Sequence, residues 1–271
     1  MKIACVGDNC IDSYDGTGQA FPGGNAVNVA VYLRRLGVEA SYTGAVGSDA
    51  NGALLREALA QRGVDLRRLR VIPGATAVSH VEIIDGDRVF GPYEEGVMAE
   101  FRPTEEDIDF LSGHDLVAAS LWGHAETALP ELRRRGIPTA FDASERPFSE
   151  TARLALPHTT VFFFSDAGSG DEALEEKLRQ LRALGPELVV ATRGSRGSIA
   201  WDGRSFHRAG IVPCEIVDTI GAGDSYIAGF LAAWGSRAGS PACMAAGAEN
   251  AAATIAYRGA WGESLTPGRG E

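Results

Sequence analysis

The chain has 271 residues, of which 45% are hydrophobic and 23% are charged, a composition ordinary for a soluble globular protein. Its length favours one large α/β domain with an appendage over two equal domains. The net charge of −11 argues against nucleic acid or an anionic membrane as the main partner, because both require a basic face.

The N-terminal residues run directly into a strand-like segment without a signal peptide, and no apolar run is long enough to span a bilayer. The four cysteines show no Cys-x-x-Cys spacing, and the five histidines form no pair at i, i+4. A metal site of the Cys/His type therefore has no support. We expect a cytoplasmic protein with reduced thiols and with neither a nucleic-acid nor a membrane partner.

Strand and helix patterns alternate along most of the chain, which favours a mainly parallel sheet covered by helices. In chain order, the expected strands are residues 2–7, 40–46, 137–142, 161–164 and 188–192. The expected helices are residues 25–36, 52–62, 128–135 and 171–184. Hairpin-like segments follow at 198–202 and 206–212, before the C-terminal helices.

One region departs from this alternation. Residues 76–92 alternate polar and apolar side chains around the turn Asp85-Gly86-Asp87, which predicts an antiparallel hairpin. Together with residues 12–22, the hairpin could form a small sheet that covers a pocket. The alternative is an ordinary hairpin on the surface.

The stretch from Asp218 to Ser225 precedes an apolar helix pattern at positions 227, 230, 231 and 234. Its small residues at 221–223 leave backbone N–H groups at a helix N-terminus, where the dipole favours an anion. A bound phosphate would repel Asp224, but the carboxylate is well placed to take a proton from the group that attacks the phosphate. The alternative is a helix N-cap, where Asp and Gly are both common.

Two further segments combine glycine with the start or the end of a regular element. Gly23-Gly24 opens the first expected helix, where a ligand can approach the backbone and the amides of Asn25 and Asn28 suit hydroxyl groups. Residues 192–197 follow an apolar strand, at the edge where open α/β sheets bind ligands. The alternatives are helix capping and a tight turn. Neither the dinucleotide fingerprint nor the phosphate-loop sequence is present.

Together these segments resemble the PfkB family of ribokinase-like carbohydrate kinases, over residues 2 to about 262. The two signatures are Gly23-Gly24-x-Ala26-x-Asn28-x-Ala30 and Asp218-Thr219-x-Gly221-Ala222-Gly223-Asp224 with Ala228-Gly229. The resemblance implies an α/β fold, a ribokinase-like three-layer α/β/α sandwich with a central mainly parallel sheet and a small β lid. It implies a single kinase domain, 1–271, with the lid formed by about 12–22 and 76–97.

The resemblance also implies roles for individual residues. The catalytic base would be Asp224, with an anion hole formed by the backbone of Gly221, Ala222 and Gly223. The residues that hold sugar hydroxyls would be Asp12, Gly24, Asn25 and Asn28. The residues that border the nucleotide would be Thr192, Gly194 and Gly197, with Asn250 on the adenine side. ATP and Mg²⁺ are the implied cofactors, and a K⁺ loop near Asp218, Ile220 and Gly259 is left open.

The chain lacks the family's Asn-x-x-Glu motif, which helps to organise magnesium and phosphate. Phe164 is followed by Ser-Asp-Ala-Gly-Ser, and the candidates to replace the motif are Asp166, Asp171 and Glu172. The metal ligands therefore stay unknown at this point. Asp142 begins a partial match to an Asp-x-Asn-x-Arg run of related kinases.

Segments outside the general signatures, 87–99 and 122–126, resemble the family members that phosphorylate O-6 of Amadori compounds such as fructoselysine. They predict four further substrate-binding residues, Tyr93, Glu95, Trp122 and Glu126. The alternatives are a PfkB kinase for another small sugar or nucleoside, such as fructose or ribose, or a catalytically weak sugar-sensing homologue. A nicotinamide-dependent oxidoreductase is disfavoured by the missing glycine fingerprint. The partners implied are a sugar and ATP, and a homodimer through the lid is left open.

Overall fold

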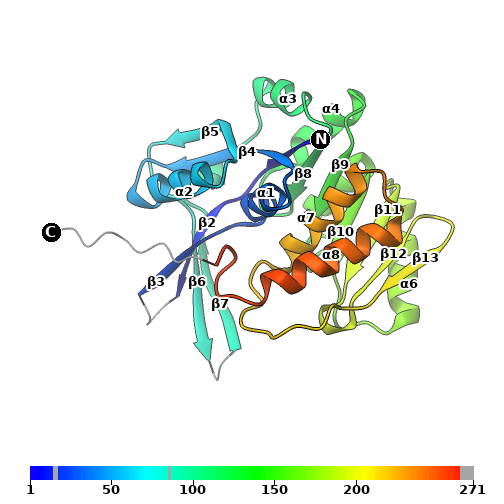
Figure 1. The fold of residues 1–271 in the computed structure, drawn as a ribbon. Helices are drawn as coiled ribbons and strands as arrows, with labels where there is room; N and C mark the ends of the chain where they lie inside the picture. Colours follow the sequence, from blue (N-terminus) through cyan, green and yellow to red (C-terminus); the bar gives the residue numbers. More distant parts are fainter. Residues whose placement is uncertain (15–17, 85–86, 263–271) are drawn as a thin grey trace.

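The computed structural model describes residues 1–14, 18–84 and 87–262 (Figure 1). Nine strands of the described residues form a central sheet in the order β13-β12-β11-β10-β9-β8-β1-β4-β5. Their bounds are β1 Lys2–Val6, β4 Glu39–Gly47, β5 Asp65–Ile72, β8 Leu116–Ser120, β9 Thr139–Asp142, β10 Val161–Ser165, β11 Leu188–Thr192, β12 Ser198–Trp201 and β13 Phe206–Ala209. The pairs from β5 to β11 are parallel, and β12 and β13 add an antiparallel edge.

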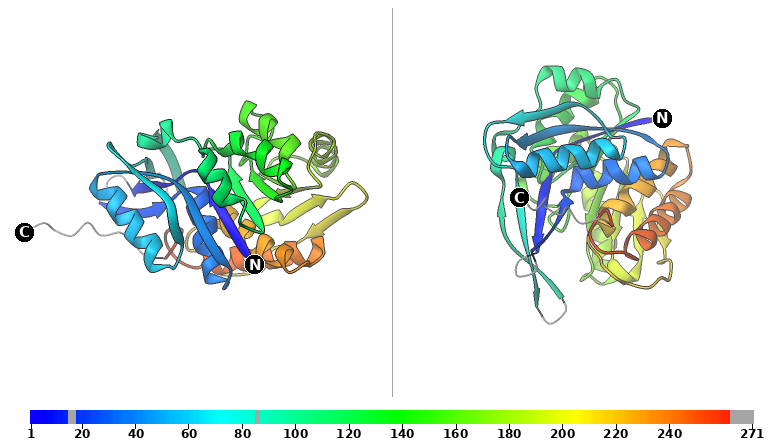
Figure 2. Two further views of the ribbon diagram at one scale, coloured as in Figure 1. Left: turned by 90° about the horizontal axis from the view of Figure 1, so that it is seen from above. Right: turned by 60° about the vertical axis from the view of Figure 1, so that its left-hand side comes forward.

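Helices cover both faces of this sheet (Figures 1 and 2). They are α1 Asn25–Arg35, α2 Ala50–Gln61, α3 Glu105–Leu111, α4 Leu129–Arg134, α5 Glu150–Ala155, α6 Asp171–Ala183, α7 Ala222–Gly235 and α8 Ser240–Thr254. Short 3-10 segments are η1 Gly96–Glu100, η2 Ala125–Ala128, η3 Leu156–His158 and η4 Gly194–Arg196. Among the helices described, none combines the length and apolarity that crossing a bilayer requires.

Side chains of successive residues in the buried strands point to opposite faces of the sheet, so the protein has two hydrophobic cores, one on each face. In β10, Phe163 belongs to the core that includes residues of α1, α2, α7 and α8, whereas Phe162 and Phe164 belong to the core that includes residues of α3 to α6. Leu178 of α6 belongs to the second core and Phe230 of α7 to the first. The predicted three-layer α/β/α sandwich is thus confirmed, as are the strands and helices expected in it.

A second, smaller sheet has the strand order β3-β2-β6-β7. Its strands are β2 Cys10–Tyr14, β3 Gln19–Gly23, β6 Val78–Ile84 and β7 Asp87–Glu94. It joins the two segments that the sequence analysis assigned to a small lid sheet, and it extends away from the central sheet (Figure 1). Tyr14, Phe21 and Val81 form its own small core, against which Ile220 packs. Residues 85 and 86 of the predicted turn lie outside the described residues.

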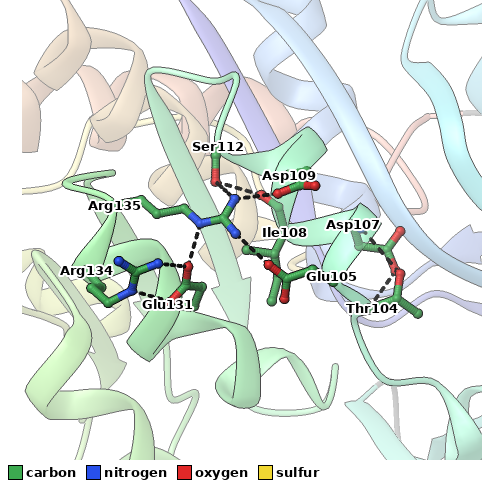
Figure 3. A network of polar contacts seen from close by, with 9 residues as sticks. All are labelled: Thr104, Glu105, Asp107, Ile108, Asp109, Ser112, Glu131, Arg134 and Arg135. Atoms are coloured by element: carbon green, nitrogen blue, oxygen red, sulfur yellow. Dashed lines mark hydrogen bonds and ion pairs between the residues drawn. The ribbon is translucent and has the colours of Figure 1, made fainter.

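An ion-pair network joins α3 to α4 at the periphery (Figure 3). The Arg135 guanidinium contacts Glu105 at 2.7 Å and both Asp109 and Glu131 at 2.6 Å. Hydrogen bonds from Arg134 and then Arg135 lower the pKa of Glu131 to about 2. The acids of this region therefore have cationic partners that fix the two short helices to each other.

Candidate active site

A cleft of about 1170 Å³ separates the small sheet from the carboxyl edge of the central sheet. Its walls come from the small sheet, the ends of β9, β10 and β11, and the segment that leads into α7. The lining residues include Tyr14, Gln19, Phe21, Asn25, Asp142, Ser165, Thr192 and 218–224. This is the edge at which open α/β sheets bind ligands, so the cleft is the candidate active site.

Two glycines at the start of α1 allow it to pack closely on its neighbours, because neither position has room for a Cβ atom. Gly24 packs on the loop that follows β1, and Gly23 packs on β2. Gly24 has φ +110°, and a Cβ there would lie 2.5 Å from Asn9 Cα. A Cβ on Gly23 would lie 2.2 Å from the Asp12 carboxylate. Asp12 therefore lies against Gly23, next to Gly24 at the N-terminus of α1, and close packing is what requires glycine at both positions.

Asp8, which the sequence analysis did not select, holds this helix start in place. Its carboxylate accepts hydrogen bonds from Asn25 N at 2.7 Å and from Ser120 Oγ at 2.6 Å. Asp8 is buried, with 5% of its surface exposed. Asp8 belongs to the segment Gly7-Asp8-Asn9-Cys10, which directly follows the first strand at the carboxyl edge of the sheet.

Asp224 lies in the first turn of α7 and is held by the two predicted asparagines of α1. Asn25 Nδ2 donates to Asp224 Oδ1 and Asn28 Nδ2 donates to Oδ2, both at 2.7 Å. Asn25 Nδ2 also donates to Asp142 Oδ2 at 2.8 Å. The two signatures, 199 residues apart in sequence, thus meet at one carboxylate. Both side-chain amides are directed at Asp224, so they orient the carboxylate.

Burial and neighbouring negative charges raise the pKa of two carboxyl groups of the cleft, Asp224 and Asp142. Burial raises the pKa of Asp224 well above its ordinary value, and the negative charges of Asp142, Asp8 and Asp12 add to the shift. The hydrogen bond from Asn28 opposes it. Burial likewise raises the pKa of Asp142. A carboxyl group with a raised pKa at a cleft wall is suited to accept a proton.

The N-terminus of α7 presents backbone donors to the cleft. Gly221 adopts φ +73°, and a Cβ there would lie 2.4 Å from Tyr32 Oη. Ala222 N donates to Thr219 O at 3.2 Å, whereas no described residue accepts a hydrogen bond from the N–H of Gly221 or Gly223. A Cβ on Gly223 would meet nothing within 4 Å. Two of the three predicted anion-hole donors are therefore available, and Ala222 is engaged in a turn.

The loop before α7 is tied to the segment after α8. Asp218 accepts hydrogen bonds from Ile220 N at 2.7 Å and from Gly259 N at 2.8 Å. The three residues expected near a monovalent cation therefore lie together. Arg258, which the sequence analysis did not select, is the one basic side chain among the described residues that line the cleft.

The predicted nucleotide residues are only partly brought to the cleft. Thr192 lines it, with its hydroxyl 3.0 Å from Ser165 Oγ. Gly194 and Gly197 form the turn after β11, with φ +56° and +77°, and are not among the described lining residues. Asn250 of α8 also lies outside the described lining, and its Nδ2 donates to the Ser225 carbonyl at 2.7 Å. It therefore ties α8 to α7.

Two of the three candidates for the missing Asn-x-x-Glu motif, Asp166 and Asp171, are already paired with cations, and the third, Glu172, is exposed in the first turn of α6. Asp166 binds the Lys177 ammonium and Ser169 N, and although burial opposes it, these hydrogen bonds lower its pKa to about 2. Asp171 lies 2.6 Å from the Arg193 guanidinium. Within the described part of the chain, no three acidic, His or Cys side chains are grouped to hold a metal ion.

Of the four residues expected to recognise the substrate, Tyr93 and Glu95 lie at the end of β7 and just after it, and Trp122 and Glu126 lie in and after the loop that follows β8. The contact of Glu95 with His124 shows that the two segments are neighbours. The loop after β8 lies against the loop after β1, since a Cβ on Gly123 would be 2.3 Å from Gly7 Cα. Trp122 is 44% exposed, and the Arg146 guanidinium lies 5.5 Å from its ring centroid.

Glu95, Tyr93 and Glu126 are the other three residues expected to recognise the substrate. Glu95 lies 3.7 Å from His124, and burial together with the nearby Asp8 raises the pKa of the Tyr93 hydroxyl. Glu126 Oε2 is buried, with no hydrogen-bond partner among the described residues. A buried carboxylate oxygen without a partner is costly unless a ligand donates to it.

A parallel α/β sheet with a polar cleft at its carboxyl edge, a carboxylate in the first turn of a helix and backbone amides beside it is an arrangement suited to phosphoryl transfer. The model of the pfkB family carbohydrate kinases matches residues 3–266, and the chain belongs to this family. It is therefore a phosphotransferase that acts on a sugar hydroxyl.

Individual relatives agree with this assignment. The chain is 47% identical to fructoselysine 6-kinase of Shigella flexneri, over 96% of this chain and 99% of that protein. It is 36% identical to the fructosamine kinase FrlD of Bacillus subtilis, over 97% and 93% of the two chains. The structure of Arabidopsis thaliana ribokinase with ribose and ATP superposes with a TM-score of 0.83 at 20% identity, covering 95% of this chain and 93% of that one. The predicted ribokinase-like fold is thus confirmed.

Proposed function

We propose that the protein transfers the γ-phosphoryl group of ATP to O-6 of fructoselysine or a closely similar Amadori compound. The identity of 47% to a fructoselysine 6-kinase over nearly the whole chain supports the substrate. The observation that carries the chemistry is the Asp224 carboxylate held by Asn25 and Asn28 at the N-terminus of α7.

Asp224 accepts the proton of the attacking hydroxyl. Two amide donors fix the direction of its carboxylate, and the raised pKa makes the group a better base than an exposed aspartate. The N–H groups of Gly221 and Gly223, with the helix dipole, stabilise charge on the transferring phosphoryl group. Phosphoryl transfer needs mainly alignment and charge stabilisation, which this arrangement supplies.

Mg²⁺ with ATP neutralises phosphate charge when it is bound. Since Asp166 and Asp171 are paired with cations, they do not fit as dedicated ligands, and the metal would be held largely by phosphate oxygens and water. The nucleotide would lie along Thr192 and the turn of Gly194 and Gly197, with Asn250 nearby. A K⁺ site at the loop of residues 218–220 belongs to the same proposal, and exchange of K⁺ for Na⁺ in the assay tests it.

The small sheet would close over the sugar and exclude water, which suppresses hydrolysis of ATP. Tyr14, Gln19 and Phe21 of this sheet already line the cleft. ATP as the donor is consistent with a cytoplasmic enzyme. A homodimer through the small sheet is a separate expectation, which light scattering of the purified protein tests.

Recognition of the amino-acid moiety would come from Tyr93, Glu95, Trp122 and Glu126. Fructoselysine carries ammonium groups, and the unpartnered Oε2 of Glu126 is an acceptor for one of them. Glu126→Gln and Glu95→Gln should raise KM for fructoselysine more than for free fructose. Glu100→Gln, at an exposed position on η1, is the matched control. Equal effects on both sugars would exclude the assignment.

The deciding assay is ADP release over a panel of fructoselysine, other fructosamines, fructose, ribose and adenosine. We expect the highest kcat/KM for fructoselysine. A higher kcat/KM for fructose, ribose or adenosine would show that the proposed substrate is wrong, although the protein would still be a kinase. Binding of a fructosamine without turnover would instead support the sugar-sensing alternative.

A further inference from the structure

The segment after α8, residues 257–262, lies along one face of α1. This face is formed by Asn28, Tyr32 and Arg35, which are spaced at i, i+4 and i+7. The Tyr32 hydroxyl donates to the Ala260 carbonyl, and the Arg35 guanidinium donates to the Trp261 carbonyl. The C-terminal segment is thus attached to the helix that carries both asparagines of the site.

Trp261 reaches the site directly. Its indole Nε1–H donates to Asn28 Oδ1 at 2.7 Å, between residues 233 apart in sequence. Trp261 is 2% exposed and Asn28 is 5% exposed, so water does not compete for this hydrogen bond. The Arg62 guanidinium lies 4.9 Å from the indole ring centroid and adds a cation–π contact to it.

This hydrogen bond selects one of the two orientations of the Asn28 amide. An indole N–H is a donor only, so it requires the amide oxygen on its side. The amide nitrogen then faces Asp224, to which it donates at 2.7 Å. In the reversed orientation, an oxygen would face the carboxylate and an NH₂ group would face the indole N–H, and both contacts would be repulsive.

We infer that Trp261 is a positioning residue of this active site, whose N–H holds the Asn28 amide in the orientation that supports the Asp224 carboxylate. The inference rests on the proposed function for its catalytic consequence. Without the indole N–H, the amide can rotate, Asp224 loses a fixed donor, and its carboxylate is no longer directed at the attacking hydroxyl.

Protonation of Asp224 gives a readout that a merely structural role would not move. The hydrogen bond from Asn28 stabilises the charged carboxylate and opposes the rise in its pKa. Losing it should raise that pKa further and move the acidic limb of the kcat profile to higher pH. The titratable groups that face Asp224 are Asp8, Cys10, Asp12, Tyr32 and Asp142, and a substitution at Trp261 leaves all of them in place.

The test is W261F, which keeps an aromatic ring and removes the N–H. We expect kcat to fall about tenfold, the effect of one hydrogen bond to a charge-bearing pair, with KM for sugar and ATP within about twofold. In an N28A background, W261F should lower kcat by less than about a further twofold, because Trp261 acts on Asp224 only through the Asn28 side chain. Y257F, in the same segment but without a contact to Asn28, should leave kcat unchanged.

Two measures keep the test decisive. If W261F unfolds, benzothienylalanine at position 261 replaces the N–H by sulfur and keeps the shape of the ring. A ¹³C NMR titration of Asp224 detects the rise in its pKa without any turnover, so it separates this inference from the choice of sugar. A kcat for W261F within about twofold of the parent, an unchanged Asp224 titration, or a full effect in the N28A background would overturn the assignment.

Discussion

Two regions of the molecule concentrate acidic side chains, and they treat these acids in opposite ways. Around Arg135, the carboxylates of Glu105, Asp109 and Glu131 all contact one guanidinium. In the cleft, Asp224 and Asp142 instead share the neutral amide of Asn25. In the first region the pKa of Glu131 is lowered, whereas in the second the pKa of Asp224 is raised.

The difference follows from what each cluster has to do. A guanidinium between helices converts acids into fixed charged partners, which stabilises the packing of α3 on α4 and leaves nothing to react. Amide donors orient a carboxylate without neutralising it, so it keeps its capacity to bind a proton. Acids held by neutral donors at a cleft therefore indicate chemistry, whereas acids held by cations indicate structure.

Asp224→Asn should give the largest effect. Asn keeps the size of the side chain but cannot accept the proton, so kcat should fall by roughly 10²–10⁴ while KM for both substrates changes little. Steady-state kinetics on the preferred sugar measure this. Turnover within about threefold of the parent would remove Asp224 as the base and most of the proposed mechanism with it.

The same variant should be more stable than the parent near neutral pH. Because the pKa of Asp224 is raised by folding, the folded state binds this proton more tightly than the unfolded chain does. The ionised carboxyl therefore costs stability as pH rises above its unfolded pKa, about 3.9, towards its folded pKa. Thermal melts should show an advantage for the variant that disappears at low pH. A variant that melts below the parent at neutral pH would contradict this.

Gly223→Val should affect catalysis without affecting the fold. A Cβ at this position meets no atom within 4 Å, so the side chain projects into the cleft where the phosphoryl group would lie. Loss of one such donor typically lowers kcat by about 10²–10³. The kcat of Gly223→Ala, whose side chain is smaller, should lie between the kcat of the parent and that of the Val variant. A well-folded Val variant with the kcat of the parent would reduce this loop to a helix cap.

Asp142→Asn should move the pH dependence in the direction opposite to W261F. Removing a negative charge that faces Asp224 lowers the pKa of the base, so the acidic limb of kcat should shift to lower pH by about one unit. Asp115→Asn is the control, since Asp115 accepts from Lys2 N far from the cleft. A shift to higher pH in Asp142→Asn would show that Asp142 acts on Asp224 by some means other than its charge.

Much of the fold could be predicted because buried parallel strands and amphipathic helices leave strong patterns. β8 was not predicted, since its sequence, Leu-Val-Ala-Ala-Ser, contains one β-branched residue and two alanines and so has a weak strand signal. β5 was not predicted either, because an edge strand with Arg68 and Arg70 reads as polar surface. These arginines contact Asp107 of α3, which only the tertiary structure reveals.

The site was predictable where its chemistry is local. The glycines and Asp224 of the second signature, and the asparagines of the first, lie in short segments that carry their own pattern. Trp261 was not predictable, because its hydrogen bond to Asn28 joins positions with no local relation. Asp166 is a candidate to replace the Asn-x-x-Glu motif because it follows Phe164, where that motif would stand, but the structure pairs it with Lys177, a partner 11 residues away that the motif does not predict.

Arg135→Ala should give the smallest effect on activity and so completes the comparison of the two acidic regions. It removes the cation that Glu105, Asp109 and Glu131 share, although Glu131 keeps its ion pair with Arg134, so the melting temperature should fall by roughly a few degrees while kcat stays within about twofold. Arg134→Ala is the matched control, because the 73%-exposed Arg134 has Glu131 as its one ion-pair partner among the described residues and Glu131 would keep Arg135, so the loss should be barely measurable. Salt near 1 M should narrow the difference between Arg135→Ala and the parent, since it screens both the ion pairs and the repulsion that replaces them. A large loss of kcat without a change in melting temperature would mean that this region also serves the reaction, and the distinction between acids held by cations and acids held by amides would fail.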